Sequence, residues 1–264
     1  MTGAWGWIRG GRTVLFLVVF LLYLVLFMGL LQRLVIFPMA WWSPASAPRL
    51  FASWVRLQAR NTLRLLRVLG GVRVRVDGRI PPQSCIVIMN HQSIIDIPIG
   101  LSIMPGPLPL IPGRRRYAKG IPGVSAYLRS AGNPLVSQKP EHRKADLAGI
   151  LDAARRVDIG EASLLIFPEG HRTKDGDILP FMPGGLHVVL NRTQRPVYCA
   201  VGDGMWKSRT LKDTFFNLPN VRAQVRILGP FQPPADKTEI QAFVDRVRGE
   251  MMATLAEMRR VDGL

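Results

Sequence analysis

An uncharged apolar segment near the amino terminus constrains the fold of this chain more than any other feature. From Thr13 to Leu31 the sequence carries no charged side chain. As a helix that rises 1.5 Å per residue, this segment spans roughly 28 Å, which matches the hydrocarbon core of a bilayer. The sequence therefore predicts a helix inserted in a membrane.

A cleaved signal peptide is the alternative for this segment, because Arg9 and Arg12 precede it and the small residues 45–47 (Ala-Ser-Ala) follow it. The apolar run is too long for a signal peptide, the small residues lie far from it, and Pro48 would follow the cut. We therefore expect a retained anchor. Arginines lie on both sides of the run, so charge asymmetry does not decide its orientation, and a re-entrant helical hairpin stays open.

The stretch that follows also has features of a membrane surface. Trp41 and Trp42 close a second apolar patch, and indole rings favour the interface between lipid and water. In residues 49–68, arginines alternate with apolar side chains, as in a helix that lies on anionic lipid. A solvated surface helix of the folded domain is the alternative. We expect residues 1–68 to form membrane-inserted and interfacial helices, and residues 69–264 to form one folded domain.

The net charge indicates the kind of partner without identifying it. Lys and Arg total 35 against 18 acidic residues, which gives a net charge of +17. The positive electrostatic field of such a charge attracts phospholipid headgroups, coenzyme A phosphates, acidic carrier proteins and nucleic acid alike. No aromatic stacking platform or groove-reading motif supports nucleic acid, so we expect anionic membrane lipids.

Two cysteines, Cys85 and Cys199, lie in apolar runs that predict buried strands. Two isolated cysteines form neither a disulfide framework nor a metal site, so we expect a reduced domain that faces the cytoplasm.

From residue 72 onward, short apolar runs alternate with helical patterns, which is typical of an α/β domain. Residues 72–76 alternate in polarity and predict an exposed strand, whereas 85–89, 163–167 and 197–201 are continuous apolar runs expected of central strands. Helical spacing predicts a helix over 147–157, and a capping box at Thr238 predicts another that ends near Arg259. We expect a central, mostly parallel sheet flanked by helices.

Polar residues directly follow two of the predicted central strands. His91 and Asp96 come after the first strand, and a turn into a helix can bring the carboxylate to one imidazole nitrogen. The other nitrogen is then free to act as a general base on an alcohol that attacks a thioester, with no serine or cysteine nucleophile. The alternative is a structural histidine beside a solvated carboxylate.

The second cluster, residues 168–172, follows the next central strand, and both strand ends can face one crevice. Arg172 offers a planar set of donors to phosphate, Gly170 allows close approach of an anion, and Glu169 could orient Arg172 or a substrate hydroxyl. A polar turn is the alternative. The other three histidines lack metal-ligand spacing, so we expect no metal and place them at the surface or behind the site; they are His142, His171 and His187.

Together, Asn90-His91-x-x-x-x-Asp96, Phe167-Pro168-Glu169-Gly170-x-Arg172 and Arg195-Pro196-Val197 resemble the ordered blocks of the 1-acylglycerol-3-phosphate acyltransferase family. The resemblance covers residues 72 to about 230, and the segment 181–187 and the N-terminal helices also look like those of bacterial members. It implies that His91 is the base, that Asp96 orients it, and that Glu169, Gly170 and Arg172 bind the acceptor. It also implies an α/β sheet flanked by helices, with an apolar tunnel for the acyl chain.

The chain departs from the family pattern at two places. His171 replaces a threonine of the third block, and Ser137-Gln138 stands where the second block has Asp-Arg. Lys139 or the run 114–116 could supply the missing cation, although an ammonium does not reproduce a bidentate clamp. The candidate substrate-binding residues are therefore Asn90, Arg116, Lys139, Glu169, Gly170, Arg172 and Pro196.

These residues predict transfer of a fatty acyl group from acyl-coenzyme A or acyl-carrier protein to a lysophospholipid, most simply lysophosphatidic acid. Another lysolipid, such as a lyso-aminolipid, would need the missing arginine less. A thioester hydrolase would use the same base on water, and a non-catalytic reading makes the chain a basic protein of the membrane surface. We expect no cofactor, and a location at the inner membrane with the catalytic domain in the cytoplasm.

Overall fold

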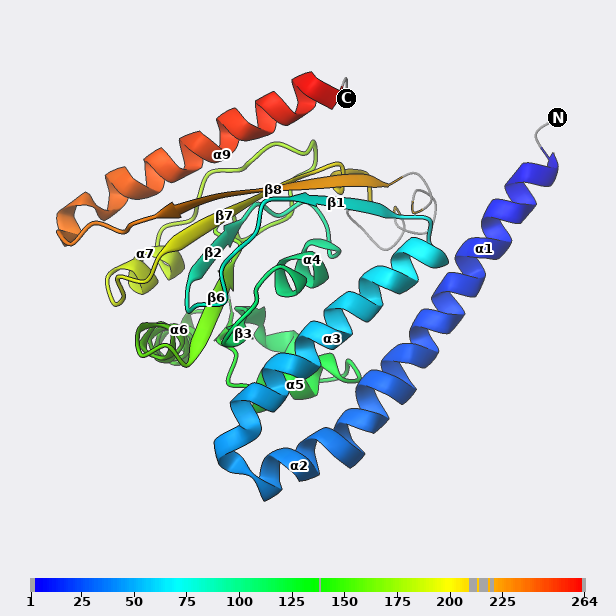
Figure 1. The fold of residues 1–264 in the computed structure, drawn as a ribbon, viewed down its shortest axis with the longest axis horizontal. Helices are drawn as coiled ribbons and strands as arrows, with labels where there is room; N and C mark the ends of the chain where they lie inside the picture. Colours follow the sequence, from blue (N-terminus) through cyan, green and yellow to red (C-terminus); the bar gives the residue numbers. More distant parts are fainter. Residues whose placement is uncertain (1–2, 138, 209–212, 214–217, 219–220, 263–264) are drawn as a thin grey trace.

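The computed structural model describes residues 3–137, 139–208, 213, 218 and 221–262. Its first feature is one long helical rod, α1 (Gly3–Leu22), the π-helix η1 (Tyr23–Ile36) and α2 (Phe37–Trp42). After a 3-10 turn, η2 (Pro44–Ser46), the helix α3 (Ala47–Val68) runs back along it (Figure 1). Within the described residues, one helical segment, Val14–Trp42, is long and apolar enough to cross a membrane. The predicted apolar helix is confirmed and extends farther than expected.

The basic amphipathic helix faces protein rather than lipid. The apolar side of α3 is buried against α4 and the N-terminal rod, with Phe51, Trp54, Val55 and Leu66 all at most 7% exposed. The expectation that this side lies on lipid is wrong, and the surface-helix alternative describes it. Amphipathic spacing cannot show whether lipid or protein covers the apolar side.

Six strands form the main sheet in the order β1-β8-β7-β2-β6-β3. Their bounds are β1 (Arg73–Asp77), β2 (Ile86–Met89), β3 (Leu108–Leu110), β6 (Ala162–Ile166), β7 (Val197–Asp203) and β8 (Arg222–Phe231). All neighbours pair in parallel except β7 and β8. The predicted mostly parallel sheet is confirmed, with the three continuous apolar runs at β2, β6 and β7 and the alternating run at the exposed edge.

A second sheet pairs two short parallel strands, β4 (Gly113–Arg114) and β5 (Leu135–Val136). The remaining helices are α4 (Asp96–Ser102), α5 (Val124–Ser130), α6 (Arg143–Asp158), α7 (Gly185–Leu190) and α9 (Ile240–Asp262). Short 3-10 turns are η3 (Arg115–Ala118), η4 (Pro140–His142), η5 (Trp206–Ser208) and η7 (Lys237–Glu239). Figure 1 shows α9 along one face of the sheet and α3 and α4 on the opposite face.

The start of the last helix differs from the prediction. The cap is Asp236, whose carboxylate accepts a hydrogen bond from the Thr238 backbone N–H at 2.8 Å, and the α-helical turns begin only at Ile240. Thr238 therefore lies inside the 3-10 turn and does not cap the helix. Asp236 thus caps the 3-10 turn that precedes the helix, and the capping box at Thr238 predicted the wrong register.

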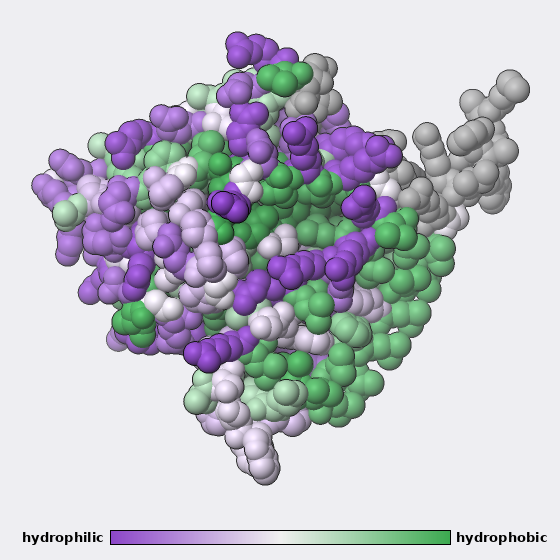
Figure 2. Space-filling view, viewed as in Figure 1, coloured by the Kyte–Doolittle hydropathy of each residue, from purple (hydrophilic) through white to green (hydrophobic). Residues whose placement is uncertain are grey.

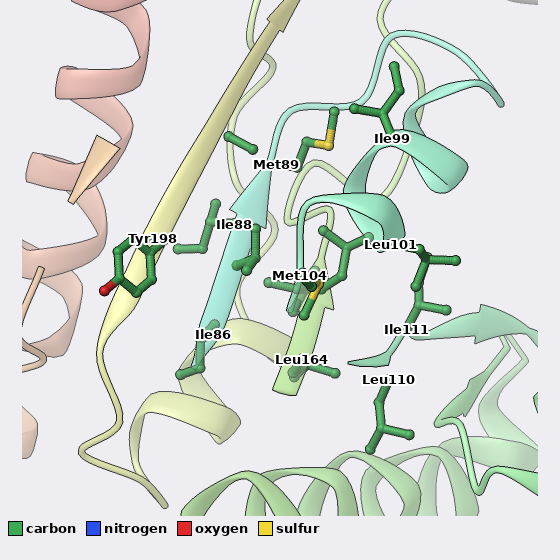
Figure 3. Packing of buried hydrophobic residues seen from close by; sticks show 14 of the residues in the cluster. Ile86, Ile88, Met89, Ile99, Leu101, Met104, Leu110, Ile111, Leu164 and Tyr198 are labelled. Atoms are coloured by element: carbon green, nitrogen blue, oxygen red, sulfur yellow. The ribbon is translucent and has the colours of Figure 1, made fainter. Parts of the chain in front are cut away.

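The core explains why the strands are continuous apolar runs. Every residue of β2 is fully buried between helices on its two faces, and Figure 3 shows its side chains packed against α4 and β6. Gly100 permits this close packing of α4, because a Cβ there would lie 2.5 Å from Leu165 Cδ2.

The direction of the strands determines where the polar segments lie. Since β2, β6 and β7 run in parallel, the polar segments after Met89 and Ile166 leave from the same edge.

Candidate active site

The predicted histidine and aspartate form a bonded pair. His91 follows β2 and Asp96 opens α4, and the distance from His91 Nδ1 to Asp96 Oδ2 is 2.8 Å. The same carboxylate oxygen accepts the backbone N–H groups of Gln92 at 2.6 Å and Ser93 at 2.7 Å. Asp96 is fully buried. The loop 91–96 thus folds around the carboxylate, which can hold the imidazole in one orientation.

The His91 ring is held from a second side as well. It stacks on Phe167, with 4.3 Å between ring centroids and 24° between planes. The side chain keeps 17% of its surface exposed. Because Nδ1 donates to Asp96, the neutral imidazole carries its lone pair on Nε2. An oriented imidazole of this kind, with part of its surface exposed, can act as a general base.

Glu169 bonds to the backbone of two segments. Its Oε1 accepts the His91 backbone N–H and its Oε2 accepts the Leu179 backbone N–H, both at 2.8 Å. It is 2% exposed, and burial raises its pKa to about 7 against those two hydrogen bonds. Oε1 therefore ties the loop 168–184 to the loop 91–96, whereas Oε2 bonds within the loop 168–184 itself. The expected role of Glu169 in orienting Arg172 or a substrate hydroxyl stays a prediction.

Asn90 is also structural. Its side chain is fully buried, and it donates to Gly202 O at 2.8 Å and accepts from Gly202 N at 2.7 Å. These bonds tie the end of β2 to β7, where the side chain continues the hydrogen bonding of the sheet. The expected contact of Asn90 with substrate stays a prediction.

Pro196 lies at the other end of the central strands from His91. It precedes β7, and its carbonyl accepts a hydrogen bond from Ile86 N at 3.0 Å, at the start of β2. His91 follows the opposite end of β2, after Met89. The expected contact of Pro196 with substrate stays a prediction.

Gly170 lies in the loop that follows β6. Its φ of +67° is a backbone conformation that favours glycine. Arg172 follows in the same loop and is half-buried. Its proposed contact with phosphate stays a prediction.

The candidate basic side chains make different contacts. Arg114 Nη2 lies 3.5 Å from Gly170 O. Arg116 is exposed, and its guanidinium lies 4.8 Å from the Tyr117 ring centroid. Lys139 is also exposed and its Nζ lies 3.8 Å from Glu141 Oε1. Among these cations, Arg114 contacts the loop that carries Gly170, and the expected roles of Arg116 and Lys139 in substrate binding stay predictions. Gln138 of the second block lies outside the described residues.

Sequence reasoning missed the residues that hold the loops together. Gln92 is buried and donates to Gly176 O at 2.9 Å, while its carbonyl accepts from Met205 N at 3.0 Å. From α9, Arg248 donates to the carbonyls of Ile178 and Leu179, at 3.1 and 3.2 Å. No local pattern indicates such contacts, because each joins segments far apart in the sequence.

Two of the other histidines have described surroundings. His171 is exposed, and His187 Nε2 lies 2.8 Å from Gln241 Oε1 on α9. In the part of the chain that the structure describes, no cluster of three His, Cys, Asp or Glu side chains could hold a metal ion. Both cysteines are buried as free thiols, and burial raises the pKa of Cys85 to about 11.

Residues 71–201 match the model of the family described as Acyltransferase. The mouse protein "1-acyl-sn-glycerol-3-phosphate acyltransferase alpha" is 30% identical over 211 residues, which cover 76% of this chain and 71% of the mouse protein. The human protein of the same description is 29% identical over 205 residues, or 75% of this chain and 69% of the human one.

One solved structure resembles the whole fold. The crystal structure of the 1-acyl-sn-glycerophosphate (LPA) acyltransferase PlsC from Thermotoga maritima superposes with a TM-score of 0.71. The match covers 94% of this chain and 95% of that one, at 20% sequence identity. The two proteins therefore have the same fold over almost their whole length.

Proposed function

The chain belongs to the 1-acyl-sn-glycerol-3-phosphate acyltransferase family, and from that membership we propose that it acylates the free hydroxyl of lysophosphatidic acid to give phosphatidic acid. The observation that supports this most directly is the His91 Nδ1 to Asp96 Oδ2 contact of 2.8 Å at the end of a central strand. That contact provides the general base that the transfer of an acyl group to an alcohol needs.

The reaction follows from the orientation of the imidazole. His91 Nε2 takes the proton of the acceptor hydroxyl as its oxygen attacks the thioester carbonyl carbon. The resulting imidazolium donates through Nδ1 to the buried Asp96 carboxylate, which stabilises the positive charge. Collapse of the tetrahedral intermediate breaks the C–S bond, and the proton passes from Nε2 to the leaving thiolate. The products are an ester and a free thiol.

The rest of the site positions this base. Phe167 restrains the ring, and Glu169 fixes the backbone of His91 to the loop that carries Gly170 and Arg172. We propose that Arg172 contacts the acceptor headgroup from this loop, since a planar guanidinium suits phosphate.

The donor is a thioester of coenzyme A or of acyl-carrier protein, and no other cofactor or metal takes part in this proposal. Both carriers are acidic, and the net charge of +17 favours their approach over that of neutral competitors. Nucleic acid is not among the proposed partners, because the chemistry of the site serves acyl transfer.

We propose that the chain is anchored at the cytoplasmic face of the inner membrane by its N-terminal rod. The outer side of this rod is exposed and apolar from Val14 to Trp42, and Trp41 and Trp42 at its tip are 80% and 84% exposed. Figure 2 shows these apolar side chains gathered beside a hydrophilic band over α3. Because the other side packs on α3 and α5, a re-entrant insertion beside anionic headgroups fits better than a free-standing span.

Acyl transfer from radiolabelled acyl-coenzyme A and acyl-carrier protein tests this function. The full chain in lipid vesicles is given lysophosphatidic acid, lysophosphatidylethanolamine or lysophosphatidylcholine. We expect labelled phosphatidic acid, and His91→Ala should lower kcat by about 10² to 10⁴ while the protein stays folded. His142→Ala is the matched control, because this half-buried histidine belongs to η4, remote in sequence from the catalytic loop.

Each other outcome has a distinct meaning. Product on lysophosphatidylethanolamine alone keeps the chemistry and changes the acceptor. Labelled free fatty acid without lipid product indicates a hydrolase. Full turnover of folded His91→Ala rules out His91 as the base.

A further inference from the structure

The residue that follows the base bonds on two sides. Gln92 is fully buried, and its backbone N–H donates at 2.6 Å to Asp96 Oδ2, the oxygen that also holds His91 Nδ1. Its side-chain Nε2 donates to Gly176 O at 2.9 Å and to Asp203 Oδ1 at 3.1 Å. Gln92 therefore connects the carboxylate that orients the base to two segments outside the loop 91–96.

The partners of this amide determine its orientation. Its Oε1 accepts a hydrogen bond from the Met205 backbone N–H at 3.0 Å. If the amide turned by 180°, its carbonyl would face the two acceptor oxygens of Gly176 and Asp203, and its N–H groups would face the Met205 donor. The side chain of Gln92 therefore has one favourable orientation as long as the Asp203 carboxylate stays in place.

An arginine of the C-terminal helix holds this carboxylate. Asp203 ends β7 and is only 5% exposed, and a buried carboxylate needs a cation beside it. Arg259, in the last turn of α9, lies with Nε 3.1 Å from Asp203 Oδ2 and Nη2 3.3 Å from Oδ1. The oxygen that accepts from Gln92 thus also accepts from Arg259. A further bond from Arg259 to Asp177, at 2.6 Å, involves a carboxylate that is 68% exposed, so solvent screens it.

These contacts link the C-terminal helix to the base. Arg259 holds Asp203, which holds the side chain of Gln92, and the backbone of Gln92 bonds to Asp96. Without Arg259, the buried charge of Asp203 would be uncompensated, and water or a proton would replace the guanidinium. Either change alters the acceptor that Gln92 bonds, and Gln92 directly follows His91 in the chain. A displacement of about 1 Å from the productive geometry can lower a rate about 100-fold.

We propose that Arg259, Asp203 and Gln92 are positioning residues, which hold His91 in the orientation that acyl transfer requires. This inference rests on the proposed function and adds to it a role for α9, which packs on β7. The three side chains act through the base and not on substrate. Their loss should therefore lower kcat and leave the binding of donor and acceptor unchanged.

Mixed-micelle kinetics of the full chain test this assignment. Arg259→Gln should lower kcat about 10- to 100-fold, while the KM values for lysophosphatidic acid and acyl-coenzyme A change less than about twofold. Arg259→Lys should recover part of the lost kcat, because an ammonium keeps the charge but not the planar geometry. Arg260→Gln removes the same charge from the next, exposed residue of α9 and should leave all three constants within about twofold of wild type.

A double variant tests whether the contacts act as one path. Gln92→Met keeps the length of the side chain without its amide and should lower kcat by a factor similar to that of Arg259→Gln. Because both changes break the same path, kcat of the double variant should lie within about twofold of the poorer single variant. Losses that multiply in the double variant contradict the path.

Nuclear magnetic resonance of protein labelled with nitrogen-15 histidine reports on the base without turnover. The proton between His91 Nδ1 and Asp96 Oδ2 lies in a short, charge-assisted hydrogen bond and should resonate far downfield, and its loss in His91→Ala identifies it. Arg259→Gln should shift or broaden this signal, whereas Arg260→Gln should not.

The outcomes separate this inference from the proposed function. An unchanged kcat in folded Arg259→Gln, an equal loss in Arg260→Gln, or a change confined to the KM values overturns the positioning role. If Arg259→Gln does not fold, Arg259→Lys carries the same comparison. Wild type with no acyl transfer to any lysolipid refutes the proposed function itself, and the histidine signal then decides the inference, because an unchanged signal in Arg259→Gln overturns it.

Discussion

Two buried carboxylates lie within the same cluster and perform separate tasks. Asp96 gives one oxygen to the His91 ring and to two backbone N–H groups of its own loop. Glu169 gives one oxygen to the backbone of His91 and the other to Leu179. Asp96 therefore orients the base, whereas Glu169 positions the segment that carries it.

Glu169→Gln should separate these roles. A carboxamide offers one acceptor where the backbone presents two N–H donors, so either His91 N or Leu179 N loses its partner, at a cost of about 1 to 3 kcal/mol. We expect kcat to fall about tenfold or more, with smaller changes in both Michaelis constants. Steady-state kinetics of the folded variant measure this, and Glu141→Gln, a surface change on η4, is the control.

The same variant should alter the pH dependence of stability. Burial raises the pKa of Glu169 to about 7 from the ordinary glutamate value of 4.5. Between these values the folded chain holds a proton that the unfolded chain has lost, so the free energy of unfolding falls as pH rises from about 4.5 to about 7. The loss is about 3 kcal/mol at most. Thermal unfolding at pH 5 and pH 8 should show a smaller difference for Glu169→Gln than for wild type; an equal difference contradicts this assignment.

Sequence reasoning identified the pair His91 and Asp96 because the interaction is local, five residues apart across one turn. It did not predict the contacts of Asn90 with Gly202 or of Glu169 with Leu179, because these partners lie farther along the chain and nothing in the local pattern marks them.

At the scale of elements, the contact between the N-terminal rod and α5 depends on glycine. Gly123, which precedes α5, has φ +72°, and a Cβ there would lie 2.5 Å from Met28 Cβ in η1. Gly29 faces the same contact, where a Cβ would lie 3.1 Å from Pro122 Cβ. Small residues therefore bring the rod close to the catalytic domain.

Gly123→Ala should loosen this contact. The substitution combines a strained positive φ with a clash against η1, and together these cost about 2 to 4 kcal/mol. Gly120→Ala is a matched control, because Gly120 has φ +86° but no atom within 4 Å of the added Cβ. We expect thermal unfolding to shift clearly more for Gly123→Ala than for Gly120→Ala. Equal shifts would mean that backbone strain alone matters and that the rod is not packed against this loop.

The sequence predicted some strands and helices more accurately than others. The buried strands β2, β6 and β7 matched within two residues, because continuous apolar runs bounded by turns have few other uses in an α/β fold. The strands β3, β4 and β5, of two or three residues, gave no periodic pattern to detect. The apolar side of α3 was predicted correctly, but the surface that covers it depends on tertiary packing.

The whole molecule combines a strong positive charge with one exposed apolar surface. Exposed leucine, valine, methionine and tryptophan side chains follow one another along the outer side of the rod, and the hydrophilic band of α3 lies beside them in Figure 2. A protein in water would hide such a surface, whereas one placed at a bilayer can bury it in acyl chains and set its cations against headgroups.

Introducing charge into this surface should release the protein from membranes. Leu22 and Leu26 are 53% and 54% exposed, one helical turn apart, so Leu22→Glu with Leu26→Glu leaves the core intact. Each leucine contributes roughly 1.5 to 3 kcal/mol when buried in lipid, so the double variant should lose at least about 100-fold in partition into vesicles. Leu147→Glu, at a 44% exposed leucine on α6, is the control and should partition like wild type. Sedimentation with vesicles of mixed neutral and anionic lipid measures this, and retention of the double variant at wild-type levels would assign the anchor to another surface.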